Sequence, residues 1–420
     1  MNLSIISLAK GGNKLQRLYS QFIGFVLVVL ITCSCVSFNI PSQSQTKQRI
    51  EGRILVWYSL EGKTAELAQQ SLDDYTRIYP NVKIVSEYVP EAQLSDLFIK
   101  QVKNGLGPDI LFSNYGIIPQ LVQEGVIEDL TDANIDVSSY FPSSLNQVRY
   151  QGRLYGLPTS LLTQVLCYNK DKVKSPATTL DGLLQQAKTG YSVGIFSNFA
   201  ATFWGAKIFG GKLFDEQNRV ILDGGGWAKW MEWLKQAQNE PNMIFSDNVI
   251  ALREAFSQGN LAYVVCDSQT ITQYFDIFGR EGLGVAVLPG DGEQSAGPLI
   301  YARVMVFNAV SSASQKELAL QVAQFINNTD QMKKRLIALE ASFIPVNKNV
   351  NINNRLFPIQ AVLNKQAKTA VFISLDNIEL TEKLFVQGER LYQKVMVGDL
   401  SSTEAASQLS TEMKMRQEKL

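Results

Sequence analysis

The sequence predicts an α/β fold in which helices cover a parallel sheet. Short apolar runs typical of buried strands alternate with longer segments whose apolar residues recur at helical spacing. Gly and Pro residues separate these segments, and such alternation favours parallel strands joined by helices. The chain of 420 residues also exceeds one comfortable hydrophobic core, so we expect two domains.

The alternation begins at residue 54. Residues 54–58 form an apolar run, which predicts a strand. Ala68, Leu72, Tyr75 and Tyr79 follow at i, i+4, i+7 and i+11, so they share one face of a helix. The same criteria predict, in order, a strand at 82–85, a helix at 94–102, a strand at 109–112 and a helix at 118–123.

A second region repeats the pattern with more aromatic residues. The predicted strands are 154–158, 165–169, 193–196, 261–266 and 284–288. The predicted helices are 180–188, 199–209, 227–238 and 249–256, and the chain is mostly helical from residue 316 onward. No repeat of fixed short period is present, which argues against a solenoid.

The composition excludes several functions. The chain carries 39 basic and 39 acidic residues and no basic run outside its N-terminus, so it offers no electrostatic reason to bind nucleic acid. It has no histidine, which removes His-dependent triads and His-ligated metals. We therefore expect neither a metal site nor a cofactor.

The N-terminus has the layout of a secretory signal. Lys10, Lys14 and Arg17 precede an apolar run at 22–31, and no acidic residue occurs before Glu51. A retained transmembrane helix needs about 20 apolar residues, and this run is about half that length. We therefore favour an exported protein over one held by a transmembrane helix.

A cysteine at the end of the signal offers a lipid anchor. We expect residues 1–35 to form the signal peptide, with lipid on Cys33 or Cys35. The residues that flank the two cysteines do not decide which of them carries the lipid. The polar residues 36–53 would then be a flexible tether that holds the protein at the periplasmic face of the cytoplasmic membrane.

Two cysteines remain in the body of the chain. Cys167 and Cys266 both lie in apolar, strand-like runs. In an oxidising compartment they are able to form one disulfide. Because free cysteine is a good core residue, we favour two buried thiols.

Polar loops follow several of the predicted strands. In open α/β sheets, ligands bind beyond the carboxyl ends of strands. The loops 58–63, 113–116 and 267–270 each mix hydroxyl, amide or carboxylate groups with an aromatic residue or glycine. Such groups suit a polyhydroxylated ligand, whose ring faces stack and whose hydroxyls form hydrogen bonds.

Several of these residues also have structural interpretations. Asp267 is an equally good helix cap, and Asn114 fits a turn. The cluster of tryptophans at 227, 230 and 233 follows a helix face and is better explained as core. Phe203 and Trp204 lie near the predicted start of a helix. Both a role as a ligand platform and a position in the core are consistent with this place.

Six segments occur in a characteristic order. They are Ile54-Leu55-Val56-Trp57, Gly107-Pro108-Asp109-Ile110-Leu111-Phe112, Gly152-Arg153-Leu154-Tyr155-Gly156-Leu157-Pro158, Leu166-Cys167-Tyr168-Asn169-Lys170-Asp171, Phe256-Ser257-Gln258-Gly259-Asn260-Leu261-Ala262 and Gly284-Val285-Ala286-Val287-Leu288-Pro289-Gly290. Together they resemble the family 1 extracellular solute-binding proteins, the maltose-binding-protein-like receptors of sugar ABC transporters. The similarity runs from about residue 52 to the C-terminus and rests on order and spacing.

This resemblance implies a two-lobed clamshell of the type II periplasmic-binding-protein class, each lobe a sheet flanked by helices. Residues 54–159 and 290–330 would form the first lobe, and 160–289 and 331–420 the second. A carbohydrate-like solute would bind between the lobes, and hinge closure would bury it and signal a membrane ABC permease. Such receptors are usually monomers without catalytic activity.

The resemblance also implies site residues. They are Ser59, Glu61, Asn114, Tyr115, Phe203, Trp204, Asp267 and Gln269. One departure is Tyr301 with Arg303, in a strand that is often glycine-rich in the family. Arg303 would place a guanidinium in the cleft and favour a small or anionic group, or it would pair with an acidic neighbour at the rim.

Two other classes of function remain open. An exported glycoside hydrolase would need a pair of carboxylates about 5–10 Å apart, for which Glu61 and Asp267 are the candidates. A related clamshell receptor would bind a polyamine or a small anion, and a polyamine would require several carboxylates near aromatic residues.

Overall fold

The computed structural model describes residues 50–215, 219–222, 224–340 and 342–418. Residues Ile50–Leu420 form a compact unit. The predicted signal peptide 1–35, with Cys33 and Cys35, lies outside the described residues. So does most of the predicted tether, although strand β1 already begins at Gly52, two residues inside it.

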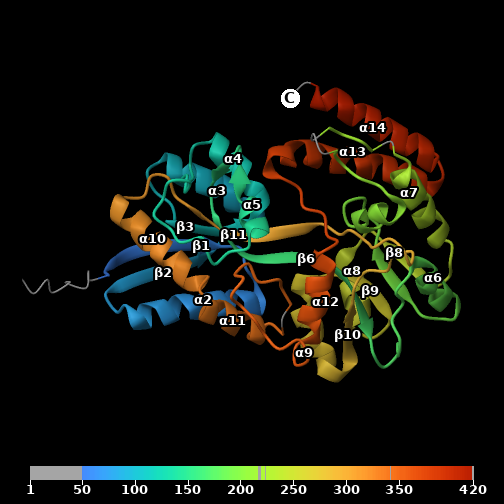
Figure 1. Cartoon of the computed structure of the whole chain (residues 1–420), viewed down its shortest axis with the longest axis horizontal. Coiled ribbons are helices and arrows are strands. Elements are labelled where there is room, and N and C mark those ends of the chain that lie inside the picture. The colour runs from blue at the N-terminus through green and yellow to red at the C-terminus, as the bar shows by residue number, and fades with distance from the viewer. Residues whose placement is uncertain (1–49, 216–218, 223, 341, 419–420) are drawn as a thin grey trace, which may run out of the picture. The chain divides into compact units, whose positions relative to one another are not determined.

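The described part of the chain is built around a mixed sheet in the order β2-β1-β3-β11-β6-β9-β7-β8, with β10 paired to β6 (Figure 1). These strands are β1 (Gly52–Tyr58), β2 (Val82–Tyr88), β3 (Ile110–Asn114), β6 (Leu157–Asn169), β7 (Val193–Phe196), β8 (Met243–Ser246), β9 (Tyr263–Asp267), β10 (Leu283–Ala286) and β11 (Ile300–Phe307). A small separate hairpin joins β4 (Arg149–Tyr150) to β5 (Arg153–Leu154). The α/β class is confirmed, with a mixed sheet in place of the expected parallel one.

Strand β6 connects two half-sheets. Its residues 157–163 pair antiparallel with β11, and its residues 164–168 pair antiparallel with β9. We call β2, β1, β3 and β11 the first half-sheet, and β9, β7, β8 and β10 the second. Within the first, β1 is parallel to β2 and β3, and within the second, β7 is parallel to β8 and β9. The parallel βαβ units predicted from sequence are therefore real, and antiparallel strands join them.

The sequence-based interpretation divided β6 into two strands, 154–158 and 165–169. The structure has one strand of 13 residues, because the hydroxyl-rich stretch between them continues the ladder. The Thr163 hydroxyl donates to the carbonyl oxygen of Leu299 at 2.8 Å, and the Thr163 amide donates to the Ser268 hydroxyl at 3.3 Å. The polar residues in the middle of β6 interrupt the apolar run, and the prediction of a strand depended on such a run.

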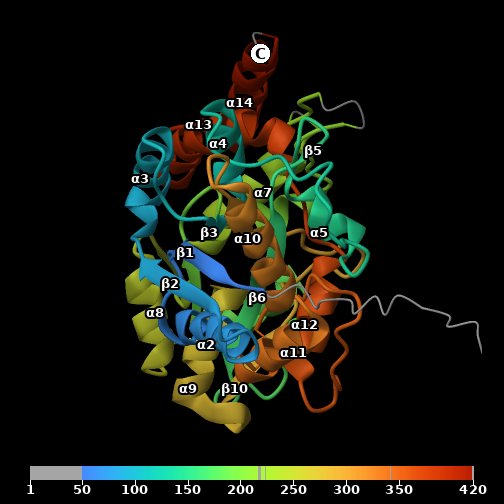
Figure 2. The ribbon, with the colours of Figure 1, turned by 90° about the vertical axis from the view of Figure 1, so that its left-hand side faces the viewer.

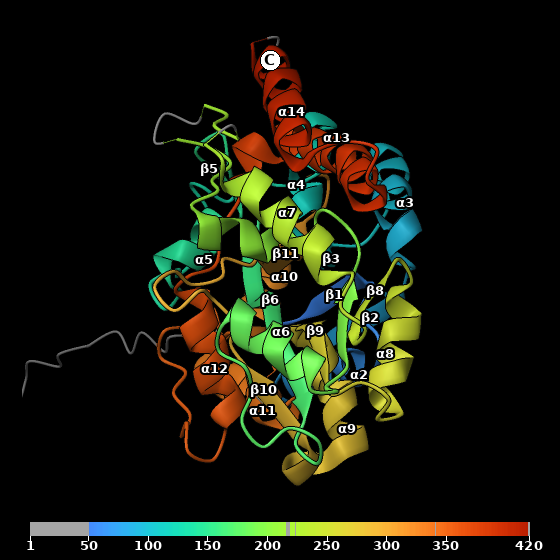
Figure 3. The ribbon, with the colours of Figure 1, turned by 90° about the vertical axis from the view of Figure 1, so that its right-hand side faces the viewer.

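Helices cover both half-sheets (Figures 2 and 3). They are α2 (Gly62–Ile78), α3 (Glu91–Lys103), α4 (Ile118–Gln123), α5 (Pro142–Asn146), α6 (Leu180–Lys188), α7 (Gly226–Ala237), α8 (Val249–Ser257), α9 (Ile271–Gly282), α10 (Ala313–Ile326), α11 (Thr329–Ala338), α12 (Pro358–Ala367), α13 (Ile378–Val397) and α14 (Ser402–Gln417). Short 3-10 turns are η2 (Tyr115–Ile117), η3 (Phe203–Phe209), η4 (Ser268–Thr270) and η5 (Leu375–Asn377). The predictions of helices at 118–123 and 180–188 and of a strand at 193–196 are confirmed to the residue, whereas 199–209 contains the 3-10 helix η3 and no α-helix.

The apolar residues form two cores. The first includes the first half-sheet, α2, α3 and α10, and extends to α8 and α9 beside the second half-sheet. The second lies between the second half-sheet and the helices α6, α7, α13 and α14. Burial of these apolar residues supplies the main stabilising free energy of the fold.

Helix α11 contacts the first half of the molecule. Its residues Gln331 and Lys334 both bond the Asp74 carboxylate of α2, at 2.9 and 3.0 Å. The division predicted from the resemblance assigns residues 331–420 to the second lobe. The lobe boundaries stay a prediction. The contact of α11 with α2 favours a boundary after the end of α11 at Ala338 over one at residue 331.

A disulfide joins β6 to β9. The Cys167 and Cys266 sulfur atoms are bonded, with their Cα atoms 5.9 Å apart. The interpretation of these residues as two free thiols is therefore wrong. Each cysteine alone has the burial of a core thiol, at 0% and 4% exposed, and only the pairing of β6 with β9 brings the two together.

Candidate functional site

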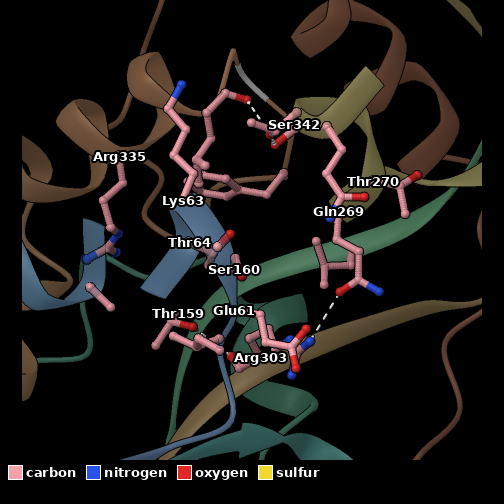
Figure 4. A pocket seen from close by; sticks show the side chains of 18 of the residues that line it. Glu61, Lys63, Thr64, Thr159, Ser160, Gln269, Thr270, Arg303, Arg335 and Ser342 are labelled. Atoms are coloured by element: carbon pink, nitrogen blue, oxygen red, sulfur yellow. Dashed lines mark hydrogen bonds between the residues drawn. The ribbon is translucent and has the colours of Figure 1, made fainter. Parts of the chain in front are cut away.

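A polar cavity of about 460 Å³ lies where loops of both half-sheets meet (Figure 4). Its polar lining comes from the β1–α2 loop, from β6 and β11, and from η4, α8, α9 and α11. The charged and polar side chains that line it are Ser59, Glu61, Lys63, Thr64, Thr159, Ser160, Arg253, Gln269, Thr270, Thr272, Gln273, Asp276, Arg303, Arg335 and Ser342. A concave site rich in hydrogen-bonding groups fits a small polar ligand.

The β1–α2 loop supplies one wall. Glu61 precedes the first turn of α2 and makes no capping hydrogen bond with its side chain. Its carboxylate instead accepts a hydrogen bond from the Tyr88 hydroxyl at 2.9 Å. Ser59, at the end of β1, donates its hydroxyl to the Glu91 carboxylate. Glu61 of this loop and Lys63 in the first turn of α2 therefore lie at the amino end of the helix, where free N–H groups also point.

Strand β11 and the 3-10 turn η4 supply a further part of the lining. The Arg303 guanidinium donates from Nη2 to the Gln269 side-chain oxygen at 3.1 Å, as the dashed line in Figure 4 shows. Arg303 Nη1 lies 3.9 Å from a Glu91 carboxylate oxygen, at ion-pair distance but beyond hydrogen-bond distance. The predicted rim pairing of Arg303 is therefore present in a loose form.

Asp267 is held from two sides. Its carboxylate accepts hydrogen bonds from the Gln269 amide at 3.0 Å and the Tyr301 hydroxyl at 2.7 Å. Burial raises the pKa of the Asp267 carboxyl, against the opposing effects of these hydrogen bonds and of the Arg303 charge. Burial also raises the pKa of the Tyr301 hydroxyl, and the Asp267 charge adds to this rise. The cap interpretation of Asp267 is confirmed.

Some of the residues implied by the resemblance are brought together. Ser59, Glu61, Gln269 and Arg303 line the cavity. Asp267 lines an adjoining cavity of about 260 Å³, which shares Arg253, Gln269 and Thr270 with the first.

Asn114 and Tyr115 lie outside both linings. The Asn114 amide donates to Glu91 at 3.0 Å, so it connects to the site through that carboxylate. The Tyr115 ring is 6.5 Å from the ring of Phe372, centroid to centroid, and does not line the cavity. Both remain candidates only for a ligand that extends beyond the cavity.

Phe203 and Trp204 are core residues. Their exposed fractions are 4% and 0%, and neither lines a cavity described above. The Trp204 ring packs edge-on against Trp230 at 4.8 Å, and Phe203 packs against Trp227 at 5.3 Å. Their proposed role as a ligand platform is corrected to packing, because η3 turns both rings toward α7. The interpretation of the tryptophan cluster as core is confirmed for Trp227 and Trp230, which are buried, whereas Trp233 is partly buried and packs against that core.

Sequence reasoning missed two of the four cationic residues of the lining. Arg253 and Arg335 lie on helices α8 and α11, where an arginine resembles any solvated helix residue. Thr159 and Ser160 lie in the hydroxyl-rich part of β6, and that run was the one signal available. Within the described residues, no group of three or more Cys, Asp or Glu side chains is arranged to hold a metal ion.

The Asp267 carboxyl makes stability depend on pH. Because its pKa is raised, the folded protein binds this proton more tightly than the unfolded chain does, whose value is about 3.9. The free energy of unfolding therefore falls as pH rises from about 4 through the folded-state pKa. In Asp267→Asn this fall is absent, so we expect the free energy of unfolding of the variant, measured by urea titration, to rise relative to that of wild type as the pH is raised above about 4. Parallel pH profiles for the two proteins would contradict this assignment.

Two half-sheets joined through β6, with a cleft lined by polar side chains from loops of both, define the two-lobed fold. The chain matches the model of the bacterial extracellular solute-binding proteins over residues 70–355, and it belongs to that family. Proteins of an extracellular family are exported, in agreement with the predicted signal. No helix in the described ranges has both the length and the apolar character that a membrane crossing requires.

Several of its relatives are named for the oligosaccharides they bind. The maltotriose-binding protein of Pyrococcus abyssi is 24% identical over 309 residues, which cover 70% of this chain and 66% of that protein. The galactooligosaccharide-binding protein of Bacillus subtilis is 22% identical over 410 residues, which cover 91% and 94%. Among solved structures, the GacH receptor of Streptomyces glaucescens superposes with a TM-score of 0.75 at 19% identity, covering 87% of this chain and 98% of the receptor. The last comparison confirms the fold.

Proposed function

We propose that this protein is the extracytoplasmic receptor of an ABC importer, and that it binds a sugar or sugar-like polyol in the cleft and delivers it unaltered to a membrane permease. The observation that carries the proposal is the polar cavity of about 460 Å³ with lining from both half-sheets. Because ligand contacts would come from both sides, binding would favour a closed arrangement of the two halves. The names of the relatives support a carbohydrate as the solute.

A hydrolase is less well supported. Its two candidate carboxylates, Glu61 and Asp267, do not line one cavity, since Asp267 lies in the adjoining one. Both Asp267 oxygens already accept hydrogen bonds, and Glu61 accepts one from Tyr88. A polyamine receptor is also less well supported, because the lining contains only Glu61 and Asp276 as acidic residues.

Membrane attachment completes the proposal. We propose a lipid on Cys33 or Cys35, a monomeric receptor, and lobes with the boundaries implied by the resemblance. Two observations support the lipid anchor: the chain belongs to an extracellular family, and its N-terminal signal ends in cysteine residues. Partitioning of Cys33→Ala and Cys35→Ala variants between detergent and water would identify the anchor, and equal partitioning of the double variant and wild type would count against it.

Calorimetric titration of the full chain tests the main proposal. We expect saturable, stoichiometric heat with at least one of a panel of mono- and oligosaccharides, and recovery of the sugar unchanged by chromatography. Bound ligand should also raise the melting temperature in proportion to affinity. Continuous heat with appearance of cleaved product would instead identify a glycosidase.

A further inference from the structure

The lining of the proposed sugar site carries an excess of positive charge. Its cationic side chains are Lys63, Arg253, Arg303 and Arg335, and its anionic ones are Glu61 and Asp276. A cleft lined mainly by one sign of charge concentrates ligands of the opposite sign, and partial burial weakens screening by salt. The charge of the lining therefore contains information about the solute.

Arg303 is the best placed of these cations. Its side chain is only 20% exposed, and Nη2 is occupied by the Gln269 oxygen. Nη1 is buried and has no hydrogen-bond acceptor among the described residues. The nearby Glu91 carboxylate accepts hydrogen bonds from Ser59 and Asn114, and at 3.9 Å it gives Nη1 charge compensation without a hydrogen bond. One guanidinium nitrogen of Arg303 is thus left without an acceptor in this arrangement of the side chains.

The other two arginines are not neutralised by ion pairs. Arg253 has no carboxylate within salt-bridge distance in the described part of the chain, and it lines both adjoining cavities. Arg335 lies on the other side of the pocket in Figure 4, where Nη1 donates to the Ile326 carbonyl at the end of α10 and Nη2 has no acceptor among the described residues. Burial lowers the pKa of Arg335 to about 10, which leaves it protonated at neutral pH.

Aromatic stacking contributes little to this cleft. The aromatic residues in the lining are Phe112 and Phe343, which are 7% and 5% exposed and belong to the core. No Trp or Tyr of the described residues lines the cavity. A neutral sugar is usually held by ring stacking together with hydrogen bonds. Recognition here must depend on hydrogen bonds and charge.

We propose that the solute is an anionic saccharide, a small sugar that carries a carboxylate or a phosphate group, and that Arg303 binds this group. A guanidinium forms paired, charge-assisted hydrogen bonds to both groups. Arg253 and Lys63 add to the attractive potential, while Glu61, Gln269 and Thr159 are available to the sugar hydroxyls. The inference rests on the proposed function, because it specifies the solute of the same cleft.

Matched sugar pairs provide the test. Calorimetric titrations of the full chain with D-galacturonate against D-galactose, and with D-glucose 6-phosphate against D-glucose, compare ligands that differ mainly in the acidic group. We expect at least one acidic sugar to bind at least tenfold more tightly than its neutral partner, with affinity falling as salt is raised. The two pairs separate a carboxylate from a phosphate preference, and inorganic phosphate alone tests for simple anion binding.

Arg303→Gln links the preference to one residue. In this variant we expect the acidic sugar to lose its tenfold advantage while the neutral partner binds as before. Arg390→Gln is the matched control, since Arg390 pairs with Glu412 on the remote helices α13 and α14. Tighter or equal binding of neutral sugars, or an equal effect of Arg303→Gln on both members of a pair, would overturn the anionic preference and leave the sugar receptor standing. If no sugar binds, both proposals fail.

Discussion

Removing the disulfide is expected to lower the free energy of unfolding by about 2–5 kcal/mol. Cys167 and Cys266 are 99 residues apart, so their bond closes a long loop in the unfolded chain. On the chain-entropy account, a loop of about 100 residues corresponds to about 4.7 kcal/mol, because the unfolded state loses conformational freedom. The double variant Cys167→Ala with Cys266→Ala keeps the site apolar. Urea titration of this variant beside wild type measures the loss.

Reductant supplies the control for this prediction. Wild type unfolded and refolded in reductant should approach the stability of the double variant, whereas the variant should not respond to reductant. Alkylation of both Cys167 and Cys266 in denatured, unreduced wild type, mapped by mass spectrometry, would show that the bond is absent. Export to an oxidising compartment makes the bonded form the expected one.

Replacing Trp204 by alanine is expected to cost about 3–5 kcal/mol of stability. The side chain is fully buried against Trp230, and a Cβ added to the neighbouring Gly205 would stand 2.2 Å from the Trp230 ring. Packing this close leaves little room for the surroundings to collapse into the cavity that the substitution creates. Differential scanning calorimetry and urea titration measure the effect.

Trp204→Phe is the matched comparison. The Trp204 ring nitrogen has no hydrogen-bond partner among the described residues, so substitution by phenylalanine removes no hydrogen bond and should lower stability clearly less. The fraction of Trp204→Ala that stays folded should bind sugar with the wild-type affinity. Unchanged stability together with weakened binding would restore Trp204 to the site.

The elements that sequence placed best are those with local causes. Helix α6 begins at a Thr179 cap and carries one apolar face, and its predicted bounds were correct. Strand β6 was divided in the prediction because its central Thr and Ser residues are stabilised by bonds to distant segments, such as that from Thr163 to Leu299. A local pattern does not contain partners that lie more than a hundred residues away.

Part of the cavity lining was predicted where loop chemistry sufficed. Ser59, Glu61 and Gln269 follow strands and carry polar groups, and the structure brings them together with Arg303 in one cavity. Arg253 and Arg335 carried no local signal, because only the packing of α8 and α11 turns them toward the cleft. The resemblance also pointed to Phe203 and Trp204, which η3 directs into the core.

The sequence by itself determined the strand–helix alternation, the exported class and the polar loops, since each depends on residues close together in the chain. The tertiary structure alone decided that β6 joins the two half-sheets, that Cys167 bonds Cys266, and that arginines from separate helices and strands line one cavity. These features depend on contacts between distant segments, and such contacts form only when burial of the apolar faces brings those segments together.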